Sequence, residues 1–415
     1  MSISRQTDLV QNEDFKIWAR STTFDLIIYS NTGMDIAAAL ASKMKAKLIA
    51  FTPAGASPMT DVDIHGLPVE SSWLHDWSLG SKYFFIPDHF AFAYNTISWY
   101  LSYKWSYLPR LDYLVKELYP EDDIPPMEEL IRNVSLIFLN EHYSTGYPRA
   151  LPPFVIPVGG LYTKESDGTL PKDLEAFIST ADQFVFISFG SAIKYSKLTE
   201  ELQSLMIEVL ASFENINFLW KWDGEVPKTL PKNIFFSKVL RQNDVLGHKN
   251  CKGFITQGDQ ISSHQAAFHG VPMVVIPVWE DQLFNARSLE YNGIGIYVEL
   301  SEITEEALRN ALLNILTNPW FSNNGKLISD RFKDRPLSPL ATALWWTEYV
   351  LRHDTAHLKS PGVYQYWWQR RLLDFYFAIL FAGILLVVVR IYIGRLILRF
   401  MIKIFYKAKD KLKRS

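Results

Sequence analysis

Short apolar runs alternate with helix-like stretches along the second half of this chain, and this alternation restricts its fold more than any other feature. Runs typical of buried strands begin at Phe184 and recur at 217–222, 233–236, 253–256, 272–277 and 294–300. Stretches of helical length separate them at about 199–213, 262–269, 281–291 and 304–316. Because repeated strand-then-helix order builds a parallel sheet with helices on both faces, we predict a doubly wound α/β domain.

The first half of the chain shows the same pattern in a shorter form. Apolar runs at 24–29 and 47–51 flank a helix-like stretch that reaches Lys45, and further strands are predicted at 134–139 and 154–158. This order indicates a second, partial α/β domain. We therefore predict domains at 1–160 and 161–360, then a transmembrane helix at 372–393 and a basic tail at 394–415.

The predicted transmembrane helix rests on the uncharged run FYFAILFAGILLVVV at 375–389, which continues past Arg390 to Ile393. It approaches the roughly 20 residues that a bilayer core requires. Trp367 and Trp368 precede it and many basic residues follow it, which disfavours the alternative of a buried core helix. Basic residues mark the cytoplasmic end, so we expect a cytosolic tail and a body on the other side. The final KLKRS resembles the KxKxx signal of endoplasmic-reticulum membrane proteins.

The first twenty residues carry charges throughout and contain no apolar leader core. Two interpretations are open. In the one we favour, the sequence begins inside a longer protein, and the body lies in the lumen of the endoplasmic reticulum. In the other, the transmembrane segment directs its own insertion and leaves the body in the cytosol.

The distribution of charge and cysteine excludes several classes of function. The chain has 42 basic and 44 acidic residues, and the basic ones are concentrated after residue 394. The body therefore has no general basic surface, and we predict no nucleic-acid partner. Cys251 is the single cysteine, so an intrachain disulfide and a cysteine zinc site are both excluded. We expect a small buried hydrophobe at this position.

Polar groups follow the predicted strands at four loops, which are 190–191, 242–244, 257–259 and 279–282. Loops at the carboxyl ends of parallel strands meet at one crevice, where such sheets bind ligands. Gly258 opens a predicted helix whose N-terminus suits a phosphate, although a glycine also serves any tight turn. Asp281 and Gln282 offer acceptors and a donor for sugar hydroxyls, although Asp is also an ordinary helix cap.

Other enzyme signatures are absent from the sequence: it has no GxSxG elbow, no GxxxxGK[ST] phosphate loop and no HExxH zinc helix. His248, His264 and His269 lie close in sequence without the carboxylates that would support a ligand set. We interpret them as structural or surface residues, with His264 alone placed to touch a ligand.

The stretch FITQGDQISSHQAAFHGVPMVVIPVWEDQLFNA at 254–286 resembles the signature of the UDP-glycosyltransferases, the membrane-bound UDP-glucuronosyltransferase family. The resemblance extends to FISFGS at 186–191, RQNDVLGHKN at 241–250 and ALWWTEYVLRHDTAHLKSP at 343–361. It implies a GT-B architecture with two Rossmann-like domains, the first of them incomplete here, plus one C-terminal transmembrane helix. In that architecture the second domain holds the UDP-sugar and the first holds a lipophilic acceptor.

The resemblance also assigns roles to single residues. It places Ser191 and the Gln257–Gly258 turn at the diphosphate, Gln242 at the uracil and Gln265 at the ribose, with Asp281 and Gln282 at the sugar. It implies transfer of glucuronic acid or a hexose to small lipophilic hydroxyl compounds. No metal or cofactor is implied, because the UDP-sugar is a co-substrate. The expected partners are this donor, the acceptor, the membrane and related glycosyltransferase chains.

Four donor-site positions depart from the family pattern. Val239 replaces a tryptophan that stacks on uracil, and Asp259 replaces a glycine beside the diphosphate. Gln257 replaces a histidine, so it donates a hydrogen bond but never carries positive charge. Gln265 replaces a glutamate and has a single acceptor oxygen.

The family's catalytic pair, a histidine base and an aspartate that orients it, has no counterpart here. The first histidine is His65, and the aspartate position is Ser30, so we predict no catalytic residue. Two functions remain open: a UDP-glycosyltransferase, or an inactive family member or fragment that binds or regulates active relatives. Asn133 begins a glycosylation sequon on the predicted lumenal body.

Overall fold

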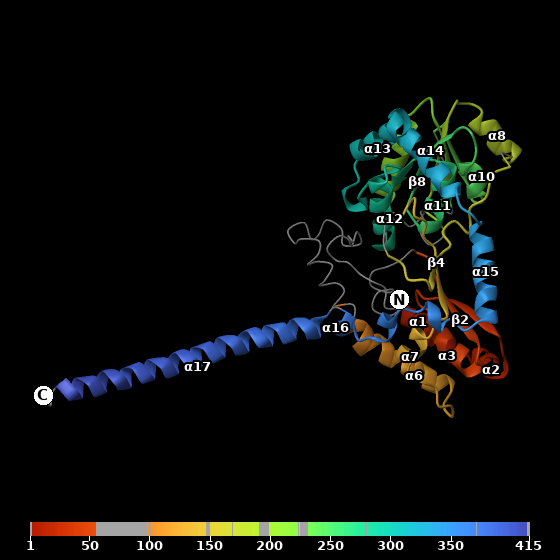
Figure 1. The fold of residues 1–415 in the computed structure, drawn as a ribbon. Coiled ribbons are helices and arrows are strands. Elements are labelled where there is room, and N and C mark those ends of the chain that lie inside the picture. Colours follow the sequence, from red (N-terminus) through yellow and green to blue (C-terminus); the bar gives the residue numbers. More distant parts are fainter. Residues whose placement is uncertain are drawn as a thin grey trace. The chain divides into compact units, whose positions relative to one another are not determined.

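A computed structural model describes residues 2–54, 98, 101–146, 150–167, 169–190, 199–222, 224, 231–278, 280–370 and 372–412. The chain divides into a first unit, Met1–Lys359, and a second unit, Ser360–Ser415. The first unit holds two parallel sheets in two α/β domains, as the sequence predicts (Figure 1).

The first domain contains a four-stranded parallel sheet in the order β1-β2-β3-β4. Its strands are β1 (Leu26–Ser30), β2 (Lys47–Thr52), β3 (Leu136–Leu139) and β4 (Val155–Pro157). Its described helices are α1 (Ser2–Gln11), α2 (Glu13–Ser21), α3 (Ile36–Met44), a π-helical turn η3 (Tyr103–Tyr107), α6 (Leu108–Leu118) and α7 (Met127–Arg132). The predicted strands at 24–29 and 47–51 are confirmed as the parallel pair β1 and β2, with α3 between them.

The second domain contains a six-stranded parallel sheet in the order β10-β9-β8-β5-β6-β7. The strands are β5 (Phe184–Ser188), β6 (Asn217–Lys221), β7 (Ile234–Ser237), β8 (Cys251–Thr256), β9 (Met273–Val275) and β10 (Gly295–Tyr297). The helices are α8 (Lys172–Ile178), α9 (Glu200–Ala211), α10 (Gln242–Leu246), α11 (Gln260–His269), α12 (Glu280–Tyr291), α13 (Glu305–Thr317) and α14 (Pro319–Lys333). The helix α15 (Pro339–Arg352) follows and contacts β2 of the first domain. The first strand lies inside the sheet, as doubly wound order requires.

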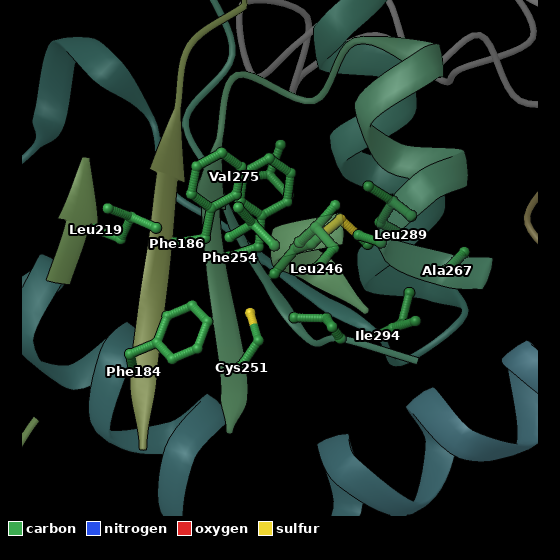
Figure 2. Close-up of a cluster of buried hydrophobic side chains, with 14 of the residues drawn as sticks. Phe184, Phe186, Leu219, Leu246, Cys251, Phe254, Ala267, Val275, Leu289 and Ile294 are labelled. Atoms are coloured by element: carbon green, nitrogen blue, oxygen red, sulfur yellow. The ribbon is translucent and has the colours of Figure 1, made fainter. Parts of the chain in front are cut away.

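Two hydrophobic clusters cover the two faces of this sheet. Phe186 on β5 stacks on Phe254 of β8, with ring centroids 5.0 Å apart, and α10, α11, α12 and α14 cover this face (Figure 2). Val185 and Ile187 point to the other face, which α9 and α13 cover. This alternation follows from the two-residue period of a strand and fixes which residues reach the strand ends.

Three parts of the first unit differ from the sequence prediction. The helices α1 and α2 were not predicted, because residues 1–20 carry too many charges to show an apolar pattern. The helix α14 was not predicted either, although Phe332 and Ile328 on it are buried in the core. The strand predicted at 294–300 ends at Tyr297, and a 3₁₀ turn follows at Leu300–Glu302.

The second unit consists of short turns (Pro361–Tyr364 among them), α16 (Trp367–Arg370) and the long helix α17 (Leu373–Leu412). Among the described residues, Leu373–Phe405 is one helix long and apolar enough to cross a membrane, and none of its most apolar window is buried. The helix continues past residue 393, the predicted end of the transmembrane segment.

Cys251 lies inside the first cluster beside Phe184, as predicted for a small buried hydrophobe (Figure 2). Burial raises the pKa of its thiol to about 12, so almost no thiolate exists at pH 8.

We expect Cys251 of the folded chain to resist a thiol reagent at pH 8 and that of the unfolded chain to react fully, as measured by mass spectrometry. Phe254→Ala, which opens a cavity next to this cluster and costs about 3–5 kcal/mol, should speed the labelling. Rapid labelling of the folded wild type would contradict this placement.

Candidate functional site

Loops from neighbouring strands of the second domain meet at the carboxyl edge of its sheet. Gly190 follows β5 and Gln257 follows β8, and these strands are parallel neighbours. The backbone of Gly190 has a φ of 71°, and a Cβ there would lie 2.3 Å from Nε2 of Gln257. Gln257 therefore packs directly against Gly190, and a side chain at position 190 would be strained at this φ and would displace the end of Gln257.

Gly258 brings a third loop to the same place. Its φ is 83°, and a Cβ would lie 2.5 Å from Val275 of β9 and 3.5 Å from the backbone oxygen of Gln282. Asn285 of α12 donates a hydrogen bond of 2.9 Å to the backbone oxygen of Gly258. The side-chain oxygen of Gln282 accepts from the backbone N–H of Val278 at 2.9 Å, so this amide holds its own loop.

Gln242 and Gln265 form the polar centre of the site. Nε2 of Gln242 donates to the side-chain oxygen of Gln265 at 2.8 Å and to Oγ of Ser262 at 3.0 Å. Nε2 of Gln265 donates in turn to the backbone oxygen of Tyr162 at 3.2 Å. The amides predicted to read uracil and ribose thus lie side by side and are bonded to each other.

Asp259 caps the helix that begins at this edge. One carboxylate oxygen accepts from the backbone N–H of Ser262 at 3.0 Å, and the other accepts from Nε2 of Gln257 at 3.1 Å. Asp is among the strongest N-cap residues because it satisfies an unpaired N–H of the first turn. The cap extends α11 to Gln260, two residues before the predicted start.

The structure describes the other predicted donor-site residues only in part. Ser191 lies outside the described residues. Asp281 lies in the first turn of α12, and its side chain is outside the described part of the structure. Val239 follows β7 and is 84% exposed, so an aliphatic side chain stands open to solvent at this end of the site.

The histidines of this region are neutral and structural. Burial lowers the pKa of His264 to about 3, and its ring packs edge-on against Phe332 at 5.3 Å. Burial likewise lowers the pKa of His269 to about 4 and of His142 to about 3. None of the three is placed to supply positive charge to a phosphate at neutral pH. Within the described residues, no group of three or more His, Cys, Asp or Glu side chains could hold a metal ion.

Ser30, at the position that the resemblance assigns to an aspartate, lies at the carboxyl end of β1 in the first domain. Oγ of Ser30 and Oγ1 of Thr32 share a hydrogen bond of 2.8 Å. The nearby Asp35 is buried at the start of α3 and accepts from the hydroxyl of Tyr107 at 2.5 Å. Asp25 is exposed at the strand start, so neither carboxylate replaces the missing aspartate.

Contacts between distant segments complete the site and were not predicted. The backbone oxygen of Tyr162 accepts a hydrogen bond from Gln265, which lies 103 residues later in the sequence. Oγ of Ser288 on α12 donates to the backbone oxygen of Thr145 in the first domain at 2.6 Å. Glu141 lines a small cavity with Ser263 and Ser288. No local sequence pattern signals such pairs, because each joins segments that are distant in the sequence and meet only in the folded chain.

The architecture is that of GT-B glycosyltransferases. Among solved structures, the spinosyn forosaminyltransferase SpnP matches with a TM-score of 0.60 over 84% of this chain and 82% of that chain, at 15% identity. At this identity the likeness shows a shared fold, in which two α/β domains each contain a parallel sheet.

The chain belongs to the UDP-glycosyltransferase family. The family profile described as UDP-glucoronosyl and UDP-glucosyl transferase matches residues 5–412. UDP-glucosyltransferase 2 of Dactylopius coccus is 31% identical over 362 residues, which is 86% of this chain and 69% of the relative. The 2-hydroxyacylsphingosine 1-beta-galactosyltransferase of Mus musculus is 33% identical over 276 residues, 66% of this chain and 50% of the relative.

Asp35 should give the stability of the first domain a distinctive pH dependence. Burial raises its pKa from 3.8 to about 6, so the folded state holds a proton that the unfolded state has already lost. The stabilisation is complete below about pH 4 and is lost as the pH rises to about 6. Asp35→Asn keeps the oxygen that accepts from Tyr107 and does not titrate.

We expect Asp35→Asn to match wild type at pH 4 and to be more stable at pH 7 by about 2–3 kcal/mol. Thermal unfolding between pH 4 and 7, followed by tryptophan fluorescence, measures the difference. Exposed Asp25→Asn is the matched control and should follow wild type throughout. Parallel stability curves for wild type and Asp35→Asn would show that Asp35 is charged in the folded chain.

Proposed function

We propose that this chain is a membrane-anchored UDP-glycosyltransferase that moves glucuronic acid or a hexose from UDP to a small lipophilic hydroxyl compound. The pairing of Gln242 with Gln265 beside the Gly258 turn is the observation that carries this proposal. It gathers the amide and backbone groups that recognise a nucleoside at the N-terminus of a helix, where a phosphate binds.

The residues present support binding and orientation of the donor. The amide of Gln242 offers a donor and an acceptor, which matches one edge of uracil, and Gln265 offers the same to a ribose hydroxyl. Asp281 and Gln282 follow β9 at the same edge, where the sugar would lie. Inverting transfer then requires the acceptor oxygen to attack the anomeric carbon while UDP leaves and the hydroxyl proton passes to a base.

The choice of sugar and acceptor rests on relatives. Their names include a glucosyltransferase and a galactosyltransferase that acts on 2-hydroxyacylsphingosine, and the family description adds glucuronosyl transfer. A lipophilic acceptor suits an enzyme whose helix Leu373–Phe405 would anchor it in a bilayer. We infer that this membrane is the endoplasmic reticulum, with the body lumenal and the tail cytoplasmic.

A second function, that of an inactive family member, is favoured by residues at the proposed donor site and at the end of β1. The carboxylate of Asp259 caps α11 beside the proposed diphosphate position, and Ser30, at the position that the resemblance gives to an aspartate, bonds to Thr32. A chain with this arrangement would bind or regulate active relatives without turning over a UDP-sugar.

A variant that restores three family residues measures how far the donor site has changed. We expect Gln257→His, Asp259→Gly, Gln265→Glu to bind UDP-glucose at least ten times more tightly than wild type. The variant regains a carboxylate that accepts from both ribose hydroxyls and loses a negative charge beside the phosphates. Calorimetry on the purified full chain gives the affinities, and UDP release under the same conditions gives the turnover.

Equal affinity in wild type and variant would show that the donor site is intact. Turnover by wild type supports the enzyme, and binding without turnover supports the regulatory chain. Ser301→Ala, in the 3₁₀ turn after β10, is a matched control and should leave both measurements unchanged.

The lumenal placement of the body predicts use of the sequon at Asn133. This side chain is exposed at the end of α7, one turn before β3 begins. We expect the full chain expressed in animal cells to lose mass after treatment with peptide N-glycosidase, and Asn133→Gln to show no such shift. A wild-type chain that is unaffected by the glycosidase would favour a cytosolic body.

A further inference from the structure

The carboxylate of Asp259 lies at the N-terminus of α11, where a helix attracts an anion. Asp259 has a φ of −64° and a ψ of 153°, an extended cap conformation that turns its carboxylate back over the first turn. One oxygen lies 3.0 Å from the backbone nitrogen of Ser262. The exposed N–H groups and dipole of a helix N-terminus attract negative charge, and this carboxylate satisfies that attraction internally.

Gln257 is turned toward the same carboxylate. Its side chain is 3% exposed, and its Nε2 donates to Asp259 at 3.1 Å instead of pointing to an incoming ligand. Its side-chain oxygen is buried and has no hydrogen-bond partner among the described residues. The turn therefore presents a carboxylate at a place where a phosphate requires donors, and the amide nitrogen of Gln257 is already used by that carboxylate.

We propose that Asp259 determines the specificity of the donor site by opposing the diphosphate, so that nucleoside binding weakens as phosphate charge is added. This inference rests on the proposed function, because it places the diphosphate of the donor at this turn. Gln242 and Gln265 read the nucleoside at a neighbouring position and are not directly opposed by the carboxylate. The chain should thus retain uridine recognition while it discriminates against UDP.

Asp259 acts both through its negative charge and as the N-cap of α11, and experiments can separate these two roles. Asn caps a helix as well as Asp does, so Asp259→Asn removes the charge and keeps an oxygen for the N–H of Ser262. Repulsion between exposed or half-exposed charges also weakens as salt is added, whereas a lost hydrogen bond does not respond in this way.

The test is calorimetric titration of the full chain with uridine and with UDP. We expect Asp259→Asn to bind UDP at least ten times more tightly than wild type at low salt and to bind uridine within about twofold of wild type. The tenfold gap should narrow when potassium chloride is raised to about 0.5 M. Asp182→Asn removes the same charge just before β5, at the opposite edge of the sheet, and should change neither affinity.

Two results would overturn the inference. If wild type and Asp259→Asn bind uridine and also bind UDP equally, Asp259 does not oppose the diphosphate and the proposed donor site stands. If neither chain binds uridine or UDP, the proposed function fails and the inference fails with it. Slow labelling of Cys251 by a thiol reagent shows that a variant is folded. If Asp259→Asn is labelled faster than wild type, Asp259→Ser, a second uncharged N-cap, is used in its place.

Discussion

The parallel pairing of β5 with β8 is the constraint on which the rest of the site depends. Phe186 and Phe254 stack on one face of this pair, and Ile187 and Ile255 are buried in the cluster on the other. Strands that are packed on both faces cannot shift along each other without exposing apolar surface. The loops that follow them, at Gly190 and at Gln257, are therefore held so close together that a Cβ added at Gly190 would lie 2.3 Å from Nε2 of Gln257.

This rigid frame lets the polar residues at the edge satisfy one another. Gln242, Gln265 and the backbone of Tyr162 form a chain of hydrogen bonds, and Gln257 and Asp259 form a second pair. A ligand must exchange these bonds for its own, which is nearly neutral in free energy when partners match and costly when they do not. Recognition by amides at such a site depends on matched geometry, whereas recognition of phosphate depends on charge.

The sequence predicts the strands well and the contacts between domains poorly, for physical reasons. The run at 253–256 is apolar and bounded by turn residues, so it was found, and the strand observed there begins earlier, at the buried Cys251. The helix at 262–269 was found two residues short, because a cap at Asp259 depends on a side-chain bond that composition does not show. The helix α1 was missed because the charges of residues 1–20 leave no apolar pattern, and its buried Gln6 adds nothing to such a pattern. Gln6 accepts from the backbone of Ile36, a pairing across 30 residues that no periodicity reveals.

Residue 259 shows how stability and ligand binding place opposite demands on one position. A glycine there leaves the first N–H groups of α11 open to an anion and gives the helix a weak cap. An aspartate satisfies one of those groups and stabilises the helix by only a few tenths of a kcal/mol relative to glycine. The same residue puts a negative charge at the turn where we propose that the diphosphate binds, so this small gain in stability would oppose donor binding. The fold is preserved because the cores on both sides of β8 do not involve this residue. The frame by which the family is recognised therefore does not depend on which residue stands at position 259.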